Sequence, residues 1–97
     1  ICGLKTYSKM ETFLRDMDFK AKQRSIVHVM DIAPGYDDTY VRRPGFIVDR
    51  ENGKLYEKLW GLVLELNPDM VIITSWNEWH EATEIEPSMV FFMERKK

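Results

Sequence analysis

Residues 71–87 read VIITSWNEWHEATEIEP, and this stretch decides the fold. It begins with β-branched apolar residues and passes, without a spacer, into tryptophans and carboxylates. A strand of a parallel sheet that is covered on both faces has a continuous apolar sequence, and in α/β folds the functional site lies where such strands end. We therefore predict a buried strand over Val71–Thr74 and a site at its C-terminal end, over residues 76–86.

The second half of this stretch is rich in carboxylates. Clustered carboxylates raise one another's pKa and resist burial, so packing alone does not explain them. Glycoside hydrolysis uses two carboxyl groups, one to protonate the leaving oxygen and one as base or nucleophile, together with flat apolar faces for the sugar. Glu78 and Glu81 are three residues apart, so their Cα atoms lie within about 11 Å and both can reach one glycosidic bond. The simpler alternative is a solvated helix start capped by Ser75 or Asn77.

Length and composition fit one small domain. The chain has 97 residues, of which 44% are hydrophobic and 31% are charged. A formal net charge of −2 argues against nucleic acid or an anionic membrane surface as the main partner. No apolar run reaches the roughly 18 residues of a membrane span. Cys2 is the only cysteine, which excludes an internal disulfide and leaves the compartment open.

Two helices are predicted from periodic apolar residues. Met10, Phe13, Leu14 and Met17 follow the i, i+3, i+4, i+7 spacing and predict a helix over Met10–Lys22, with Ser8 as N-cap and Glu11 as its capping-box partner. A second stripe predicts a helix over Leu55–Leu66, which starts after the Asn52–Gly53 turn and ends at Asn67–Pro68.

A further strand and a second polar loop precede that helix. Residues 25–32 (SIVHVMDI) predict a strand in which His28 is a hydrogen-bonded core residue. Residues 35–45 (GYDDTYVRRPG) predict a loop directly after it. If Ile26–Met30 and Val71–Thr74 are parallel, the two loops meet at one edge of the sheet. We then expect Tyr36 and Asp38 to support the site and Arg42 to pair with a carboxylate; a solvated Pro-Gly turn is the simpler alternative.

The order strand, loop, helix, strand is a βαβ unit and gives the α/β class. Two such units cannot close a (β/α)8 barrel, which takes about 250 residues. We therefore expect residues 1–97 to be a single fragment from the C-terminal part of a TIM barrel, with the remainder of the barrel as its partner. The start Ile1–Gly3, without an initiator methionine, agrees with an internal piece of a longer chain. A small open sheet, complete in itself, is the alternative.

Metal and phosphate chemistry find little support. His28 and His80 are the only histidines, and no HExxH or CxxC spacing occurs, so we predict no metal site. The sequence also lacks a glycine-rich phosphate loop and a nucleophile elbow.

Several motifs resemble one family. Residues 73–86 resemble ITSFNEWHEGTQIE, a signature of glycoside hydrolase family 99, the endo-α-mannosidases and endo-α-mannanases. Residues 34–42 resemble its PGYxDTxxR segment, and residues 52–57 its NGKYYE segment. The chain departs from the family at Trp76, Ala82 and Glu84, where Phe, Gly and Gln are usual. Ala82 is significant if its position needs a positive φ, and Glu84 adds a charge beside the site.

The resemblance implies a (β/α)8 barrel that cleaves inside α-mannoside chains with retention of configuration and needs no cofactor. By motif match it implies that Glu78 acts on the sugar 2-hydroxyl and that Glu81 is the general acid/base. The substrate would be an oligosaccharide or polysaccharide, contacted by Trp76, Asn77, Trp79, His80, Tyr36, Asp38 and Arg42. Two alternatives stay open, a family-99-like domain of polysaccharide biosynthesis and a carbohydrate-binding domain. His80 and the PGYDDT segment favour the hydrolase.

Overall fold

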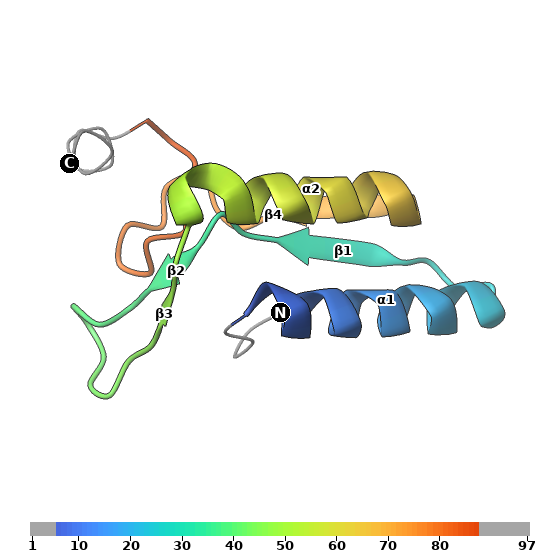
Figure 1. Ribbon diagram of the computed structural model, residues 1–97, viewed down its shortest axis with the longest axis horizontal. Helices are drawn as coiled ribbons and strands as arrows, with labels where there is room; N and C mark the ends of the chain where they lie inside the picture. Colours follow the sequence, from blue (N-terminus) through green and yellow to red (C-terminus); the bar gives the residue numbers. More distant parts are fainter. Residues whose placement is uncertain (1–5, 88–97) are drawn as a thin grey trace.

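The structure is a computed structural model that describes residues 6–87 (Figure 1). Its elements are α1 (Tyr7–Gln23), β1 (Val29–Ile32), β2 (Tyr36–Asp37), β3 (Ile47–Val48), the 3₁₀ turn η1 (Glu51–Gly53), α2 (Lys54–Leu66) and β4 (Met70–Ile73). β1 and β4 are parallel neighbours, with Val29 opposite Met70 and Ile32 opposite Ile73. The predicted βαβ arrangement is confirmed, and both strands end at the same edge of the sheet.

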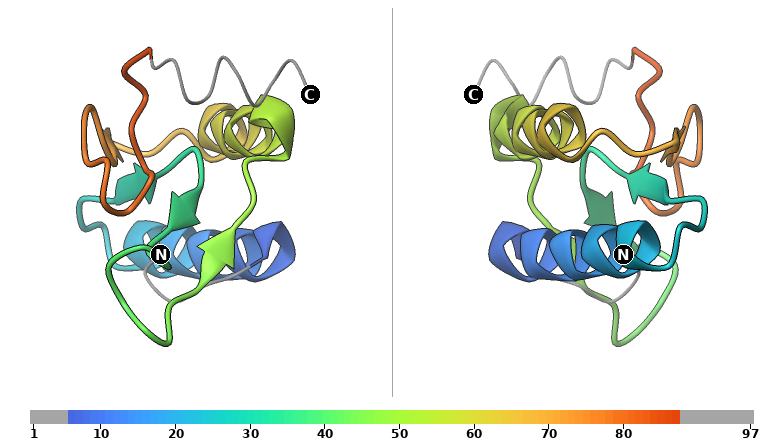
Figure 2. Two further views of the ribbon diagram at one scale, coloured as in Figure 1. Left: turned by 90° about the vertical axis from the view of Figure 1, so that its left-hand side faces the viewer. Right: turned by 90° about the vertical axis from the view of Figure 1, so that its right-hand side faces the viewer.

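Both helices cover one face of the β1–β4 sheet (Figure 2). Met30 and Ile32 point from β1 into this layer and are fully buried. They pack with apolar residues of both helices and of β3, namely Met10, Leu14, Val48, Leu55, Leu59, Leu62 and Val63. The core therefore lies between the sheet and the two helices. The stripe of α2 faces it as predicted, but of the α1 stripe only Met10 and Leu14 are buried, while Phe13 and Met17 are each 43% exposed.

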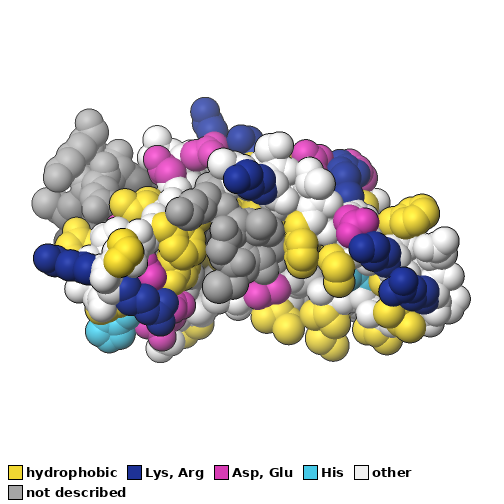
Figure 3. All heavy atoms as spheres, turned by 90° about the horizontal axis from the view of Figure 1, so that it is seen from below, with side chains coloured by type: hydrophobic (Ala, Val, Ile, Leu, Met, Phe, Trp, Pro, Cys, Tyr) yellow, Lys and Arg dark blue, Asp and Glu magenta, His cyan; other side chains and the backbone are white. Residues whose placement is uncertain are grey.

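The prediction that β4 is covered on both faces is wrong for this structure. Met70 and Ile72, on the face away from the helices, are 58% and 49% exposed. No element among residues 6–87 covers that face, although its apolar sequence suits burial under a second layer. Seen from the α1 side, hydrophobic side chains reach the surface along much of the molecule (Figure 3).

The ends of α1 differ from the prediction at both termini. Thr6, not Ser8, is the N-cap, and its hydroxyl accepts a hydrogen bond from the Lys9 amide at 3.3 Å. At the other end Ser25 has a φ of 55°, and the Ile26 amide bonds the Ala21 carbonyl at 3.0 Å. This is a Schellman exit, which uses residues 25 and 26 to end the helix. The strand therefore begins at Val29 rather than at Ser25.

α2 begins and ends as predicted. Asn52 and Gly53 have positive φ values of 56° and 89°, which bring the chain through the η1 turn into the helix. Asn67 takes a left-handed conformation after Leu66, and its amide bonds the Val63 carbonyl at 2.8 Å. Pro68 follows and cannot continue the helix.

The segment predicted as one loop over residues 35–45 is partly a ribbon. Tyr36 and Asp37 form β2, which pairs antiparallel with β3, so that Tyr36 lies opposite Val48 and Asp37 opposite Ile47. Two-residue strands are too short to show a period in the sequence. Only residues 38–46, named here the ribbon loop, connect the two strands.

His28 is a hydrogen-bonded core residue, as predicted. Its Nδ1 lies 2.9 Å from Oδ1 of Asp18, and both residues are buried. Lys22 donates to the other carboxylate oxygen of Asp18 at 2.9 Å and to the Leu66 carbonyl at 2.6 Å. Burial acts to raise the pKa of Asp18, but the hydrogen bonds from Lys22 and His28 outweigh it, so this pKa lies below its ordinary value. This polar junction joins α1 to β1 and to the end of α2.

Acid is expected to weaken this junction. Because the pKa of Asp18 in the folded chain lies below the unfolded value of about 3.9, Asp18 adds stability above about pH 4 and loses it as pH falls through the folded value. Thermal unfolding measured across this range should show a smaller acid-induced drop in Tm for Asp18→Asn than for the unchanged protein. Glu57→Gln, on the exposed side of α2, is the control. Identical pH profiles for Asp18→Asn and the unchanged protein would contradict the prediction.

Candidate active site

Two loops meet at the edge where β1 and β4 end. One is the ribbon loop, and the other is residues 75–86, named here the acidic loop, which is joined to β4 by Thr74. The amide of Asp37, in β2 next to the ribbon loop, donates to the Glu81 carbonyl at 2.8 Å and ties β2 to the acidic loop through the main chain. The edge predicted to carry the site is therefore built from segments about 40 residues apart in sequence.

The acidic loop folds back on itself and contains no helix, so the helix-start alternative is wrong. The Ser75 amide donates to the Thr83 carbonyl at 2.8 Å, and the Ile85 amide donates to the Ser75 carbonyl at 2.9 Å. The hydroxyls of Ser75 and Thr83 share a further hydrogen bond of 2.8 Å. These bonds close the base of the loop and leave residues 77–82 as its tip.

Glu78 lies at this tip. Its amide donates to the Ser75 hydroxyl at 3.0 Å, and its carboxylate accepts a hydrogen bond from the His80 amide at 3.1 Å. The His80 main chain therefore fixes one oxygen of the Glu78 carboxylate, while the residue stays exposed. An exposed, oriented carboxylate can accept a proton from a bound hydroxyl.

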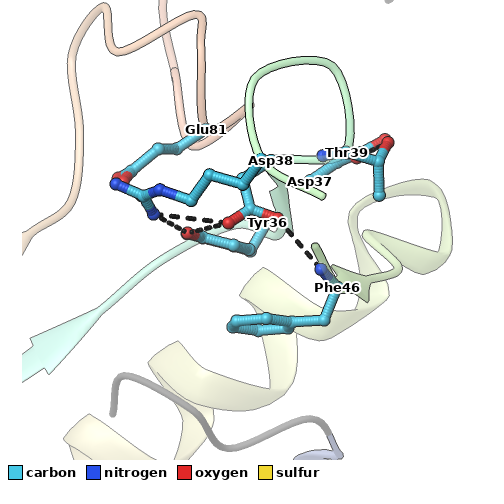
Figure 4. A network of polar contacts seen from close by, with 7 residues as sticks. Tyr36, Asp37, Asp38, Thr39, Phe46 and Glu81 are labelled. Atoms are coloured by element: carbon cyan, nitrogen blue, oxygen red, sulfur yellow. Dashed lines mark hydrogen bonds and ion pairs between the residues drawn. The ribbon is translucent and has the colours of Figure 1, made fainter. Parts of the chain in front are cut away.

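Glu81 meets the ribbon loop through Arg42 (Figure 4). Nη1 of Arg42 lies 3.4 Å from the Glu81 carboxylate, 3.3 Å from the Asp38 carboxylate and 3.1 Å from the Tyr36 hydroxyl. The Tyr36 hydroxyl also donates to Asp38 at 2.9 Å. The structure therefore brings together four of the residues that the sequence predicted for the site.

Asp38 is the buried centre of this network, with only 2% of its surface exposed. The Phe46 amide donates to its Oδ1 at 2.9 Å and is the main reason that its pKa lies below the ordinary value, with further lowering by Tyr36 and Arg42. Burial and the hydrogen bond to Asp38 raise the pKa of Tyr36, so its hydroxyl stays a donor. The Tyr36 ring stacks on Phe46 with centroids 4.6 Å apart. Asp38 thus stays ionised and holds Arg42 toward Glu81.

The other predicted substrate contacts lie open on the acidic loop. Trp76 and Trp79 are 60% and 46% exposed, and neither ring stacks on another ring among residues 6–87. Asn77 and His80 are also exposed. Neither tryptophan belongs to the core of the described chain, and their role in sugar binding stays a prediction.

Arg50 is a site-forming residue that no motif in the sequence pointed to. It follows β3, and its Nη2 donates to the carbonyls of Ala82 and Glu84 at 3.1 and 2.7 Å. Glu84, expected to add a charge beside the site, is buried, and its Oε2 lies 3.5 Å from the same Arg50 nitrogen. In the sequence, one arginine between a short strand and a turn cannot be distinguished from an ordinary surface cation, so no sequence signal identified Arg50.

Ala82 has a φ of 52°, the left-handed conformation in which the family's usual glycine is unstrained. An L-residue in this conformation costs about 1–2 kcal/mol relative to glycine. Glycine also gives the unfolded chain more conformational entropy, which offsets part of the stability gained by removing that strain. We expect Ala82→Gly to raise the free energy of unfolding by about 0.5–1 kcal/mol, measured by urea denaturation. Ala21→Gly, inside α1, is the matched control and should lower it by about 1 kcal/mol or more. A loss of stability in Ala82→Gly would contradict the argument.

Residues 6–87 contain no cluster of three His, Cys, Asp or Glu side chains that could hold a metal ion. None of the helices in that range is long and apolar enough to cross a membrane.

The chain is similar to known glycoside hydrolases. The sequence model described as glycosyl hydrolase family 99 matches residues 3–95. The glycoprotein endo-alpha-1,2-mannosidase of Mus musculus is 31% identical over 86 residues, which are 87% of this chain and 19% of that protein. The Xenopus laevis protein of the same name is 39% identical over 67 residues, 67% of this chain and 15% of that protein.

A solved structure of a GH99 enzyme is also similar to this chain. The GH99 endo-alpha-mannosidase from Bacteroides thetaiotaomicron, in complex with BIS-TRIS-propane, superposes with a TM-score of 0.72 at 37% identity, over 79% of this chain and 25% of that one. The chain thus spans about a fifth of the mouse relative and a quarter of this bacterial enzyme. The residues matched by the family, the two mannosidase relatives and the shared fold together establish that this chain belongs to glycoside hydrolase family 99.

Proposed function

We propose that this chain supplies both catalytic carboxylates of a retaining endo-α-mannosidase whose (β/α)8 barrel is completed by further strands. The observation that carries the proposal is the contact of Glu81 with Arg42 at 3.4 Å, at the C-terminal edge of two parallel strands. Active sites of (β/α)8 enzymes lie at that edge. Membership of a family whose named relatives are endo-mannosidases supports the same conclusion.

In the first step Glu78 accepts the proton of the sugar 2-hydroxyl, and that oxygen attacks C1. The bond from C1 to the glycosidic oxygen breaks, and Glu81 gives its proton to the leaving oxygen, which produces a 1,2-anhydro sugar. In the second step Glu81 takes a proton from water, which attacks C1, while the opened 2-oxygen recovers its proton from Glu78. Two inversions at C1 give net retention.

Glu78 suits the role of base rather than nucleophile. A retaining enzyme that forms a glycosyl ester places its two carboxyls about 5 Å apart on opposite sides of the scissile bond. Glu78 and Glu81 instead share the tip of one short loop, where the His80 amide already holds the Glu78 carboxylate. A group on the same side as the acid is better placed to reach the 2-hydroxyl than the far face of C1.

The decisive experiment uses the protein that carries this chain and α-mannosides that either have or lack the 2-hydroxyl. Endo cleavage of the normal substrate with retention, and no measurable cleavage of the 2-deoxy substrate, is the expected result. A 2-deoxy substrate cleaved at the normal rate, or a glycosyl ester trapped on Glu78, would overturn the mechanism. Binding of mannan without any cleavage would instead indicate a carbohydrate-binding domain.

Trp79 is expected to contact the sugar. Its ring lies exposed at the tip of the acidic loop, one residue beyond Glu78, where a flat apolar face can stack on sugar C–H groups. Trp79→Ala should raise KM about 10-fold or more, because such a contact forms in both the ground and transition states. Phe19→Ala, which removes an exposed ring on α1, is the matched control. An unchanged KM for Trp79→Ala would contradict stacking.

A further inference from the structure

The Arg50 side chain joins the ribbon to the acidic loop. Its Nη2 donates to two main-chain carbonyls, those of Ala82 and Glu84, at 3.1 and 2.7 Å. The Glu84 carboxylate lies 3.5 Å from the same nitrogen and is almost fully buried. Nη2 of a guanidinium carries two N–H donors, which the two carbonyls take up, so the buried Glu84 carboxylate, whose Oε2 has no hydrogen-bond partner among residues 6–87, contacts this nitrogen only as an ion pair.

The main chain that Arg50 holds begins immediately after Glu81. Ala82 is in the left-handed conformation, and Thr83 is 2% exposed and bonded to Ser75. The Glu81 carbonyl itself accepts a hydrogen bond from the Asp37 amide at 2.8 Å. The main chain that leaves Glu81 is therefore held at two places, at the Glu81 carbonyl by the Asp37 amide and at the Ala82 and Glu84 carbonyls by Arg50.

Gly35 leaves the space through which Arg50 reaches the loop. A Cβ at position 35 would lie 2.5 Å from Cγ of Arg50 and 3.1 Å from the Val48 carbonyl oxygen. Any side chain there would displace Arg50, because the Val48 carbonyl belongs to β3 and cannot move aside. The contacts of Arg50 with the acidic loop therefore require the absence of a side chain at Gly35.

We propose that Arg50 is a positioning residue for Glu81: by holding the carbonyls of Ala82 and Glu84, its guanidinium sets the direction in which the Glu81 carboxyl points. The inference rests on the proposed function for its effect on catalysis. Arg50 acts through the main chain and need not touch the sugar. A displacement of about 1 Å in a reacting group can cost about 10²-fold in rate, which sets the scale of the effect.

The kinetic test compares Arg50→Met with Arg50→Lys in the protein that carries this chain. Arg50→Met should lower kcat about 10²-fold with KM changed less than about threefold, because the sugar contacts remain while the acid is misdirected. Arg50→Lys should recover part of the loss, since an ammonium can hold one carbonyl but not the full set. Lys58→Met on α2, which removes an exposed ion pair to Glu51 of η1, is the control and should leave kcat unchanged.

A double substitution separates this role from a general loss of stability. Gly35→Ala should lower kcat in the same way, and Arg50→Met combined with Gly35→Ala should lower it no further than Arg50→Met alone, because both act on one contact. Additive losses in kcat, or losses that only follow the fraction of unfolded protein, would overturn the proposal.

Hydrogen exchange gives a readout that needs no activity. In Arg50→Met the amides of Ala82 and Ile85 should exchange at least about 10-fold faster, while the Thr74 amide, bonded to Ile32 across the sheet, should not change. Unchanged exchange at both loop amides would overturn the proposal whatever the kinetics. If the unaltered protein cleaves no α-mannoside, the proposed function fails, and exchange alone decides whether Arg50 holds the loop.

Discussion

Glu81→Gln should lower kcat for α-mannoside cleavage by about 10²- to 10⁴-fold, the range typical of a general acid or base. Glutamine keeps the size of the side chain and can still accept a hydrogen bond from Arg42, so folding should hardly change. The substitution removes the acid that protonates the leaving oxygen and the base that activates water. Steady-state kinetics with natural and aryl mannosides measures the loss of each of these two functions.

The leaving group distinguishes the two carboxylates. An aryl leaving group needs little protonation, so for an aryl mannoside the first step of Glu81→Gln should be largely restored. Glu78→Gln should be about equally impaired with both substrates, because its defect concerns the 2-hydroxyl. Glu86→Gln, on the same loop, is the control and should retain normal kcat. Equal responses of Glu78→Gln and Glu81→Gln to the leaving group would contradict the assigned roles.

Arg42→Met should lower kcat about 10- to 100-fold, because the carboxylates of Asp38 and Glu81 share Nη1 of Arg42 and lose their common cation. Asp38 is too buried to turn toward water, so its negative charge would then disturb the Glu81 side chain. Arg42→Lys should retain part of the activity, since the charge remains while the guanidinium geometry is lost.

Arg43→Met is the matched control, because Arg43 is the neighbouring exposed cation of the same ribbon loop. It should leave kcat within about twofold of the unchanged protein. Equal losses in Arg42→Met and Arg43→Met would show that the ribbon loop contributes only general positive charge. The comparison therefore tests the Arg42 contact rather than the charge of the loop.

Much of the fold could be predicted because it is local. The apolar residues of α2 repeat at helical spacing, and Asn67–Pro68 ends that helix through left-handed geometry and a missing amide. The change from apolar to acidic residues after Ile73 marked both the end of β4 and the candidate site. These features depend on residues within one or two turns of each other, so the sequence contains them directly.

The errors concern the two ends of α1 and the outer face of β4. Ile26 continues the apolar run of β1, but its amide completes the end of α1. Ser8 fits the sequence rule for a capping residue, yet Thr6 lies one residue before the first helical turn and caps it. The β4 sequence suits burial on both faces, but residues 6–87 cover only one.

The sequence by itself determined the two helices, the parallel strands, the family motifs and the presence of Glu78 and Glu81 on one loop. Only the tertiary structure decided that Arg42 meets Glu81 across 39 residues and that Arg50 holds the Ala82 carbonyl across 32. The register of β1 on β4 and the short ribbon between them set those distances. Register is a property of paired strands, because each strand alone fits several alignments equally well until packing against the helices selects one.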